Sequence, residues 1–238
     1  MTTGLDRRQR RRQETIAEIL SIAVELMAAD GVAALSLSDV ARRLGIQPPS
    51  LFKYFPSKLA LYDALFAEAA RRVLAEWRAG IAGAAPGVPA LRAGVTALGR
   101  WGLANQPLAQ LLFWRPVPRF EPSAEAFRPS QDHVDEIREV LATAVSLGQL
   151  RAEAAGERGH ATLSVLIAGA MTQQLANEPG ATFDSGRFTG LLPTLLDMFV
   201  AAFDATPASP AAFARQSPSR GAAEAGIARQ SPSEGEGE

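Results

Sequence analysis

The sequence predicts an all-α protein, and three observations lead to this fold class. Apolar residues recur at the three- and four-residue spacing of one helix face along most of the 238 residues. No stretch alternates apolar and polar side chains convincingly, as a half-buried β-strand does. The chain is 47% hydrophobic and 21% charged, so it can bury a core. We expect about nine helices, arranged as an N-terminal three-helix domain and a larger helical domain.

The first two helices are marked by their apolar stripes and by the residues that end them. A stripe over residues 16–27 predicts a helix that stops at Gly31, where glycine can form a left-handed cap. Ser36 can cap a short second helix over 37–44, and Gly45 ends that helix.

A third short helix is expected over residues 48–55, because Pro48 and Pro49 are tolerable only in a first helical turn. Ser57 can then cap a long fourth helix that runs to about Ala79.

The rest of the chain is also predicted to be helical. Further helices are expected over residues 89–104, 107–114, 130–147, 157–177 and 187–204. Four prolines make residues 115–129 a long irregular connection, with one possible turn of helix at 124–127.

The composition excludes several kinds of site. The chain has no Cys, so it forms no disulfide, thiolate zinc site or cysteine nucleophile, and its two histidines, His133 and His160, leave little for a metal site. We therefore expect no metal and no cofactor. No apolar run approaches the roughly 20 residues of a membrane span, and the N-terminus lacks a secretory apolar core. These features are typical of a cytoplasmic protein without a membrane partner.

Charge is unevenly distributed along the chain. Residues 1–60 hold nine basic and six acidic side chains, whereas the remainder holds 15 basic and 19 acidic ones. The formal net charge of −1 excludes a uniformly basic nucleic-acid coat, so any basic patch is local.

The two ends of the chain are compositionally distinct. Five arginines make residues 1–12 a basic arm. Residues 206–238 are rich in Pro, Ser, Gly and Ala and repeat the hexapeptide Ala-Arg-Gln-Ser-Pro-Ser, which predicts a disordered tail. Between these ends we expect two helical domains, one over residues 13–60 and one over residues 61–205.

The second and third predicted helices form a helix-turn-helix motif over about residues 35–54, with a tight turn at Gly45. The major groove of B-DNA admits one helix, whose long polar side chains can reach base edges. Lys can donate to guanine, Gln can pair with adenine, and Ser can serve a base or a phosphate. Groups at helix ends suit phosphates. The arginines of the arm suit the minor groove or the backbone, with a solvated tail as the alternative. The candidate DNA-binding residues are Arg10, Arg11, Arg12, Ser36, Ser38, Gln47, Pro48, Pro49, Ser50, Lys53, Tyr54 and Lys58.

A family pattern runs through the same segment. Its residues are Asp39-Val40-Ala41, Gly45-Ile46, Ser50, Leu51-Phe52, Tyr54-Phe55 and Ser57-Lys58. This run resembles the DNA-binding domain of TetR-family repressors, and the likeness covers about residues 12–72. Phe52 stands where the family usually has Tyr, which removes a phosphate hydrogen bond. Pro48 and Pro49 also remove two backbone donors from the start of the reading helix.

The resemblance implies that the second half of the chain holds an effector pocket and a dimer face, with two subunits reading a palindromic operator. Candidate pocket residues are Trp101, Leu111, Phe113, Trp114, Phe127, His133 and Gln174, although ordinary core packing is the alternative for the aromatic ones and a surface or capping position the alternative for His133. Candidate dimer residues on helices 157–177 and 187–204 are Ala161, Val165, Ala168, Leu192, Leu195 and Phe199, for which the alternative is an intramolecular core.

The resulting hypothesis is a homodimeric, ligand-responsive transcriptional regulator. It is a repressor that binds its operator through the major groove and leaves it when a small apolar effector binds. A helical interaction module that has lost DNA binding is the alternative, suggested by Phe52 and the two prolines. An enzyme is not expected, because Asp132-His133 with a distant Ser is too weak a catalytic set.

Overall fold

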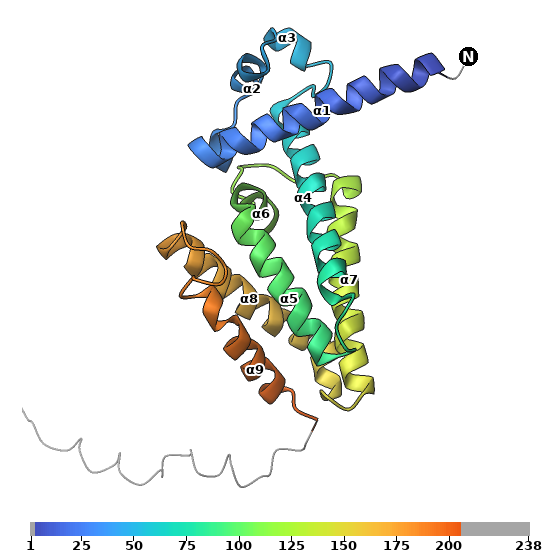
Figure 1. Ribbon diagram of the computed structural model, residues 1–238, viewed down its shortest axis with the longest axis vertical. Helices are drawn as coiled ribbons and strands as arrows, with labels where there is room; N and C mark the ends of the chain where they lie inside the picture. Colours follow the sequence, from blue (N-terminus) through green and yellow to red (C-terminus); the bar gives the residue numbers. More distant parts are fainter. Residues whose placement is uncertain (1–2, 206–238) are drawn as a thin grey trace, which may run out of the picture. The chain divides into compact units, whose positions relative to one another are not determined.

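The computed structural model describes residues 3–205, and the regular structure within this range is helical (Figure 1). Its nine α-helices are α1 (Thr3–Asp30), α2 (Leu37–Leu44), α3 (Pro48–Leu51), α4 (Lys58–Ile81), α5 (Val88–Ala104), α6 (Gln106–Phe113), α7 (Ala124–Ser146), α8 (Glu157–Asn177) and α9 (Leu192–Ala202). Three short 3-10 helices are η1 (Val32–Ala34), η2 (Ala152–Ala155) and η3 (Thr189–Leu191). The same range holds no β-ladder, only an isolated antiparallel bridge between Leu150 and Asp204. The all-α prediction is confirmed, and the predicted tail over 206–238 lies outside the described residues.

The first three helices and their connections form the head, which we define as residues 3–57. Ile19 and Ala23 of α1 are fully buried, as are Val40 of α2 and Leu51 of α3. These side chains belong to one hydrophobic cluster, so the two short helices are held against the face of α1 that the apolar stripe predicts.

The turn between α2 and α3 follows its sequence signals closely. Gly45 has φ 73° and ψ 24°, the left-handed cap conformation, and its N–H points to the carbonyls of the last turn of α2. Ser36 occupies the N-cap position of α2, but its side chain makes no capping hydrogen bond, which corrects the predicted cap. α3 ends at Leu51 rather than at residue 55, because Leu51 O accepts hydrogen bonds from both Tyr54 N (2.9 Å) and Phe55 N (3.0 Å) and the chain tightens into a turn.

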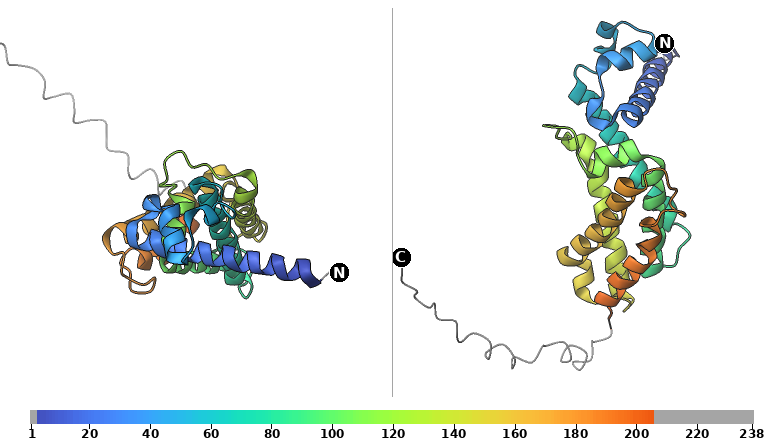
Figure 2. Two further views of the ribbon diagram at one scale, coloured as in Figure 1. Left: turned by 90° about the horizontal axis from the view of Figure 1, so that it is seen from above. Right: turned by 90° about the vertical axis from the view of Figure 1, so that its left-hand side faces the viewer.

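The basic arm is part of a helix. α1 begins at Thr3, well before the apolar stripe, so the arginines of residues 7–12 lie on its first turns. Arg, Gln and Glu have high helix propensity, and no Pro or Gly follows Gly4 before the end of the helix. Figure 2 shows this N-terminal part of α1 projecting away from the other helices.

α4 connects the head with the body, which we define as residues 58–205. Ser57 Oγ accepts a hydrogen bond from Ala60 N at 3.1 Å, which confirms the predicted cap. In the body, α4 packs against α5 and α7, and α8 packs against α9 (Figure 1). Trp77 of α4 is fully buried against Gly94 of α5, where an added Cβ would lie 2.3 Å from a ring carbon.

α7 begins earlier than predicted and runs through a proline. Ser123 caps it by accepting a hydrogen bond from Ala126 N (3.2 Å), and Ser123 is itself fixed by Asp63, whose carboxylate accepts from Ser123 N (2.7 Å) and Ser123 Oγ (2.8 Å). Pro129 therefore lies inside α7, where it removes one backbone hydrogen bond. The irregular connection is accordingly limited to residues 114–123, which we call the strap.

α8 coincides with the predicted range, whereas the last predicted helix, 187–204, is shortened to η3 followed by α9. Pro193 occupies the first turn of α9, where a proline is favoured. Every helix among residues 3–205 is too short or too polar to span a lipid bilayer.

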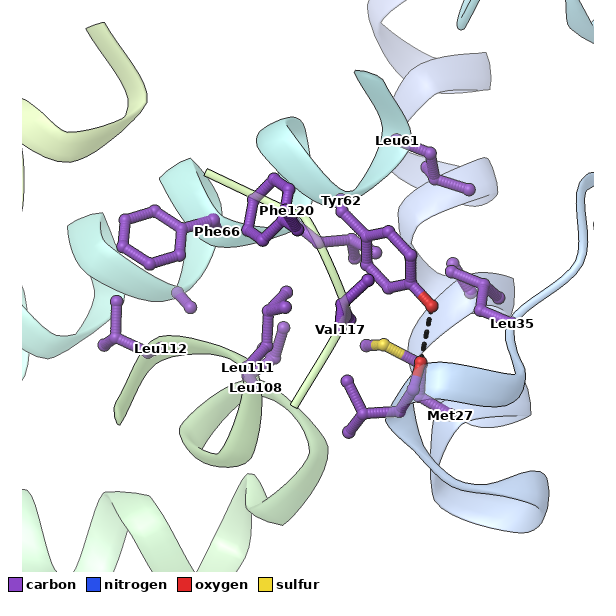
Figure 3. Packing of buried hydrophobic residues seen from close by; sticks show 14 of the residues in the cluster. Met27, Leu35, Leu61, Tyr62, Phe66, Leu108, Leu111, Leu112, Val117 and Phe120 are labelled. Carbon is purple, nitrogen blue, oxygen red and sulfur yellow. Dashed lines mark hydrogen bonds between the residues drawn. The ribbon is translucent and has the colours of Figure 1, made fainter. Parts of the chain in front are cut away.

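Two hydrophobic clusters fill the described part of the chain. One joins the head to the first turns of α4, to α6 and to the strap, and Figure 3 shows its centre around Tyr62, Phe66 and Phe120. Tyr62 Oη donates a hydrogen bond to the backbone carbonyl of Val32 at 2.6 Å. The second cluster lies among the C-terminal half of α4 and α5, α7, α8 and α9, around Trp77 and Phe199.

Candidate nucleic-acid interface and ligand cleft

The helix-turn-helix presents polar side chains on a support that is fixed from behind. Leu51 is fully buried and Phe55 is 6% exposed, so the segment 47–55 is anchored on its inner face. On its outer face, Gln47 and Lys53 are exposed and Ser50 is half-buried. This arrangement satisfies the requirement for a reading helix, which must be held rigidly while long side chains reach outward.

Other predicted contact residues surround this segment. Pro48, Pro49 and Ser38 are exposed, and Ser36, Tyr54 and Lys58 are half-buried. Phe52 is 50% exposed and therefore lies at the surface instead of in the core.

Arg12 of α1 clamps the end of the reading segment. Both terminal guanidinium nitrogens donate to Lys53 O at 3.3 Å, and the guanidinium lies 5.1 Å from the centroid of the Tyr54 ring. A cation at the C-terminal carbonyls of a helical turn is favourable. Arg12 thus contributes to holding Lys53 and Tyr54 in place.

Lys58 is also engaged within the protein. Its Nζ donates to Ala33 O at 3.0 Å and lies 5.5 Å from the centroid of the Tyr62 ring. Lys53, by contrast, extends from the exposed face of the reading segment. The two lysines of the chain therefore differ in their surroundings.

Two further arginines at the end of α2 were missed by sequence reasoning. Arg42 pairs with Asp39 at 2.5 Å and Arg43 with Glu25 at 3.0 Å, and both guanidinium groups remain more than half exposed. Exposed pairs of this kind contribute little to stability. Two basic residues in the last turn of α2 could have indicated a phosphate contact. The helix dipole alone also favours basic residues at this position, so the pattern does not by itself indicate DNA binding.

A cleft of about 630 Å³ lies in the body between α4, α6 and α7. Phe113, Phe127 and His133, three of the predicted pocket residues, line it. Phe66 and Ser130 also line it but were not among the predicted pocket residues. Ser130 lies within the helix predicted over 130–147, but the sequence did not show which face of that helix meets α4.

The other four predicted pocket residues are outside the lining of this cleft. Trp101 and Leu111 belong to the hydrophobic core. Trp114 Nε1 donates to Thr172 Oγ1 at 2.9 Å. Gln174 is fully buried and ties together the loop between α8 and α9.

The hydrogen bonds of Gln174 explain its burial. Its Oε1 accepts from the backbone N–H groups of Phe188 (3.0 Å) and Thr189 (3.2 Å), and its Nε2 donates to Glu178 O at 3.0 Å. A buried amide that satisfies backbone groups in this way has a structural role.

His133 is the most unusual polar residue of the cleft. It is 8% exposed, and its ring lies edge-on to Trp77 with centroids 5.5 Å apart. Burial, and to a smaller extent the charge of His160, lowers the pKa of His133 to about 4. The imidazole is therefore neutral near pH 7.

The outer side of α8 and η3 exposes apolar side chains. Val165 is 70% exposed, Leu191 49% and Met198 of α9 59%. Among the predicted dimer residues, Ala161, Val165 and Ala168 are exposed and Leu195 is half-buried, whereas Leu192 and Phe199 are buried within the chain's own core. A shallow groove of about 260 Å³ lies on this surface.

Comparisons with known proteins agree with this geometry. Residues 19–65 match the family model described as "Bacterial regulatory proteins, tetR family", a range that runs from the second half of α1 through α2 and α3 into the first turns of α4. This segment of the chain therefore matches the DNA-binding region of the TetR family. The match agrees with the helix-turn-helix expected in this part of the chain and supports a DNA-binding regulator.

Solved structures share the fold over most of the chain. A protein of unknown function from Rhodococcus sp. RHA1 is 21% identical with a TM-score of 0.66, covering 79% of this chain and 94% of that one. The TetR-family regulator PfmR from Thermus thermophilus is 20% identical with a TM-score of 0.60, covering 77% and 97%. FadR from Bacillus subtilis, solved with stearoyl-CoA, is 16% identical with a TM-score of 0.62, covering 79% and 98%. No curated protein matches the sequence.

Proposed function

We propose that this TetR-family protein is a homodimeric, ligand-responsive repressor that binds a palindromic operator and is released by a small apolar effector. The observation that carries the proposal is the reading segment 47–55, which exposes Gln47 and Lys53 while Leu51 anchors it. In this proposal, Gln47, Ser50 and Lys53 read base edges in the major groove.

The remaining polar groups of the head position it on the phosphates. Ser38 is exposed and Ser36 and Tyr54 are half-buried beside the reading segment, where their hydroxyls suit phosphate oxygens. The exposed arginines of α1 add a sequence-independent attraction through counterion release. Because the arm is helical, we expect it to lie along the phosphates flanking the minor groove and not to insert as an extended strand.

The dimer is supported by the exposed apolar surface of α8, η3 and α9. Val165 and Leu191 line one shallow groove, and Met198 is exposed on α9; exposed apolar surface of this kind marks interaction sites. A two-fold protein matches a two-fold operator, so a second copy of the chain is the occupant of this surface.

Ligand response is supported by continuous aromatic contacts between the cleft and the head. Phe127 of the cleft stacks on Phe66 with centroids 6.1 Å apart, and Phe66 lies 6.2 Å from Phe120 of the strap. Phe120 lies 5.8 Å from Tyr62, whose hydroxyl holds the carbonyl of Val32 in the head. A ligand that moves Phe66 or Phe127 therefore disturbs the support of the DNA-binding helices. FadR from Bacillus subtilis, which has a similar fold, was solved with stearoyl-CoA bound, and this complex also supports a ligand response.

The direct test is to sequence genomic DNA fragments captured by the purified protein, with and without a metabolite pool. We expect enrichment of a site with two inverted half-sites, lost when the pool is added. Lys53→Ala serves as the reading variant and Arg151→Ala, in the loop before η2, as a surface control. Capture of DNA without a shared sequence contradicts operator reading, and the absence of any DNA capture favours the interaction module.

A further inference from the structure

The cleft between α4, α6 and α7 contains two polar atoms that are buried without a hydrogen-bond partner. In the part of the chain that the structure describes, His133 Nε2 and Ser130 Oγ are inaccessible to water and make no hydrogen bond. Both residues line the cleft from α7, three positions apart. Buried polar atoms are nearly always paired, because an unpaired one loses its hydration without compensation. Because both side chains line the cleft, a small rotation of each toward a bound molecule lets that molecule satisfy the two atoms, which we call the polar seat.

The walls around this seat are largely apolar. Phe66 and Val73 of α4 and Leu112 of α6 line the cleft opposite α7. Its volume of about 630 Å³ falls within the range of roughly 300–1,000 Å³ for sites that bind small molecules. The body of a ligand that fills this cleft is hydrocarbon or aromatic.

The charges at the rim disfavour an ionised headgroup. Arg138 lines the cleft, but it is paired with Asp135 at 3.1 Å, and Asp132 adds a second carboxylate to the same wall. His133 is uncharged near pH 7, because burial and the neighbouring His160 lower its pKa to about 4. An anionic headgroup gains little here, because Arg138, the one arginine among the lining residues, is already paired with Asp135. A cationic headgroup would lose its hydration beside Ser130 and His133, which are uncharged and do not compensate that loss.

The hydrogen-bonding capacities of Ser130 Oγ and His133 Nε2 narrow the choice of ligand headgroup. A serine hydroxyl donates one hydrogen bond and accepts others, and the Nε2 atom of neutral histidine either donates or accepts, depending on the tautomer. A ligand hydroxyl can donate and accept at once, so it complements this pair of atoms in either tautomer.

We propose that the cleft binds an uncharged, mainly apolar molecule with one hydroxyl group, an alcohol or a phenol, whose oxygen is hydrogen-bonded by Ser130 and His133. This inference rests on the proposed ligand response of the chain and specifies the chemistry of the effector. It also separates this protein from FadR, whose ligand, stearoyl-CoA, carries charged phosphates.

Isothermal titration calorimetry of the full chain at pH 7.5 provides the test. The probes are decan-1-ol, decanoate and decylammonium, which share one hydrocarbon chain and differ in the head, together with stearoyl-CoA. We expect decan-1-ol to bind at least tenfold more tightly than each of the three charged probes. Tighter binding of decanoate, decylammonium or stearoyl-CoA overturns the proposal, as does the absence of decan-1-ol binding.

Two variants locate the binding at the seat. We expect Ser130→Ala and His133→Phe each to weaken decan-1-ol binding about fivefold or more, and to leave the binding of the charged probes unchanged. Ser146→Ala, which removes a hydroxyl at the other end of α7, is the matched control and should bind like the wild type. Ser130→Ala removes a single hydroxyl group, so it tests the seat even where His133→Phe does not fold. Unchanged decan-1-ol affinity in Ser130→Ala contradicts the assignment.

DNA binding is measured on the same preparations by gel shift. Retained DNA binding with no alcohol binding contradicts the proposed effector chemistry but agrees with the proposed DNA-binding regulator. Alcohol binding at the seat without any DNA binding supports the cleft and contradicts the proposed repressor.

Discussion

Lys53 and Lys58 are five residues apart in the segment that we propose faces DNA, and their different surroundings lead us to expect different roles. Lys53 is exposed, and its backbone carbonyl is held by Arg12. Lys58 is half-buried, and its ammonium group is tied to Ala33 O. A long side chain on a fixed backbone is suited to a base edge, whereas a cation anchored between two turns is suited to a phosphate.

Alanine substitutions of the two lysines should therefore separate reading from positioning. We expect Lys53→Ala to cost about 1–3 kcal/mol on the cognate site and to relax sequence preference. Lys58→Ala should weaken binding to all sequences alike. Fluorescence anisotropy on the captured operator and on a scrambled duplex measures both effects, and an equal loss on the two duplexes for Lys53→Ala would falsify its base-reading role.

His133 should make the stability of the protein depend on pH. The unfolded chain binds a proton at this residue below about pH 6.5, whereas the folded protein does so only below about pH 4. Between these values the unfolded state holds more protons, so stability decreases as the pH falls. The expected loss from this residue is about 2 kcal/mol between pH 7 and pH 5.

Urea unfolding of the wild type and of His133→Phe at pH 7 and pH 5 measures the contribution of His133 to the pH dependence of stability. The variant should lose about 2 kcal/mol less than the wild type over the same interval. His160 faces His133, and its own pKa is lowered by burial, so His160→Phe is the control that removes the neighbouring charge. Identical pH dependence of wild type and His133→Phe would show that the buried imidazole is not the titrating group.

At the scale of elements, the helices were predictable where the signals that begin and end them are local. Gly45 and Ser57 are such signals, and the structure forms the expected cap at each. α7 began earlier than predicted because Ser123 is fixed by Asp63 from α4, a contact 60 residues away in the sequence. α3 was shorter than predicted because Leu51 O accepts hydrogen bonds from both Tyr54 N and Phe55 N, which tightens the chain into a turn. A tertiary contact such as that of Ser123 with Asp63 cannot be inferred from the order of residues alone.

The contact between α4 and α5 depends on Gly94, which has no side chain and so leaves room for the ring of Trp77. Gly94→Ala should destabilise the protein by about 1–3 kcal/mol, because the new methyl group meets the rigid, fully buried ring of Trp77. Gly83→Ala is the control, since nothing lies within 4 Å of its Cβ position. Thermal unfolding compares the two variants. A melting temperature of Gly94→Ala equal to that of Gly83→Ala would mean that the helices separate without loss of stability.

The helical arm should determine the salt dependence of DNA binding. Replacing Arg7, Arg8, Arg10 and Arg11 by Gln keeps the helix propensity of α1 and retains the clamp by Arg12. Each arginine that neutralises a phosphate contributes about 0.9 to the slope of log affinity against log salt. We expect a shallower slope in a gel-shift salt series, with Arg151→Gln as the control. An unchanged slope would show that the arm does not touch DNA.

At the scale of the whole molecule, the exposed apolar surface of α8 and α9 should hold two copies together. Val165→Glu places a charge where we expect the partner to pack, so it should yield a monomer in light scattering at micromolar concentration. Leu147→Glu alters an exposed leucine beyond the end of α7 and should leave the dimer intact. DNA affinity should fall with the dimer, because the two half-sites are then bound independently. Light scattering that shows the wild type to be a monomer would contradict this prediction.

The sequence predicted the head more completely than the sites of the body. The helix-turn-helix is defined by a contiguous run of residues, and its exposed and buried faces follow from helical periodicity. The cleft depends on Phe66 and Ser130, which are distant in sequence and meet only when α4 and α7 pack. For the same reason Leu192 and Phe199, predicted at the dimer face, turned out to be buried in the chain's own core. The domain boundary at residues 60 and 61 stays a prediction.

The hydrophobic cluster shared by the head, α6 and the strap has a consequence for protein engineering. Tyr62, Phe66 and Phe120 lie beyond residue 57, yet they cover the inner side of the DNA-binding helices. A chimera that grafts only the first 57 residues onto a different sensor leaves that side in water. Transplanting the operator preference that we propose for this protein therefore requires its strap and the start of α4 as well, or a recipient redesigned to replace them.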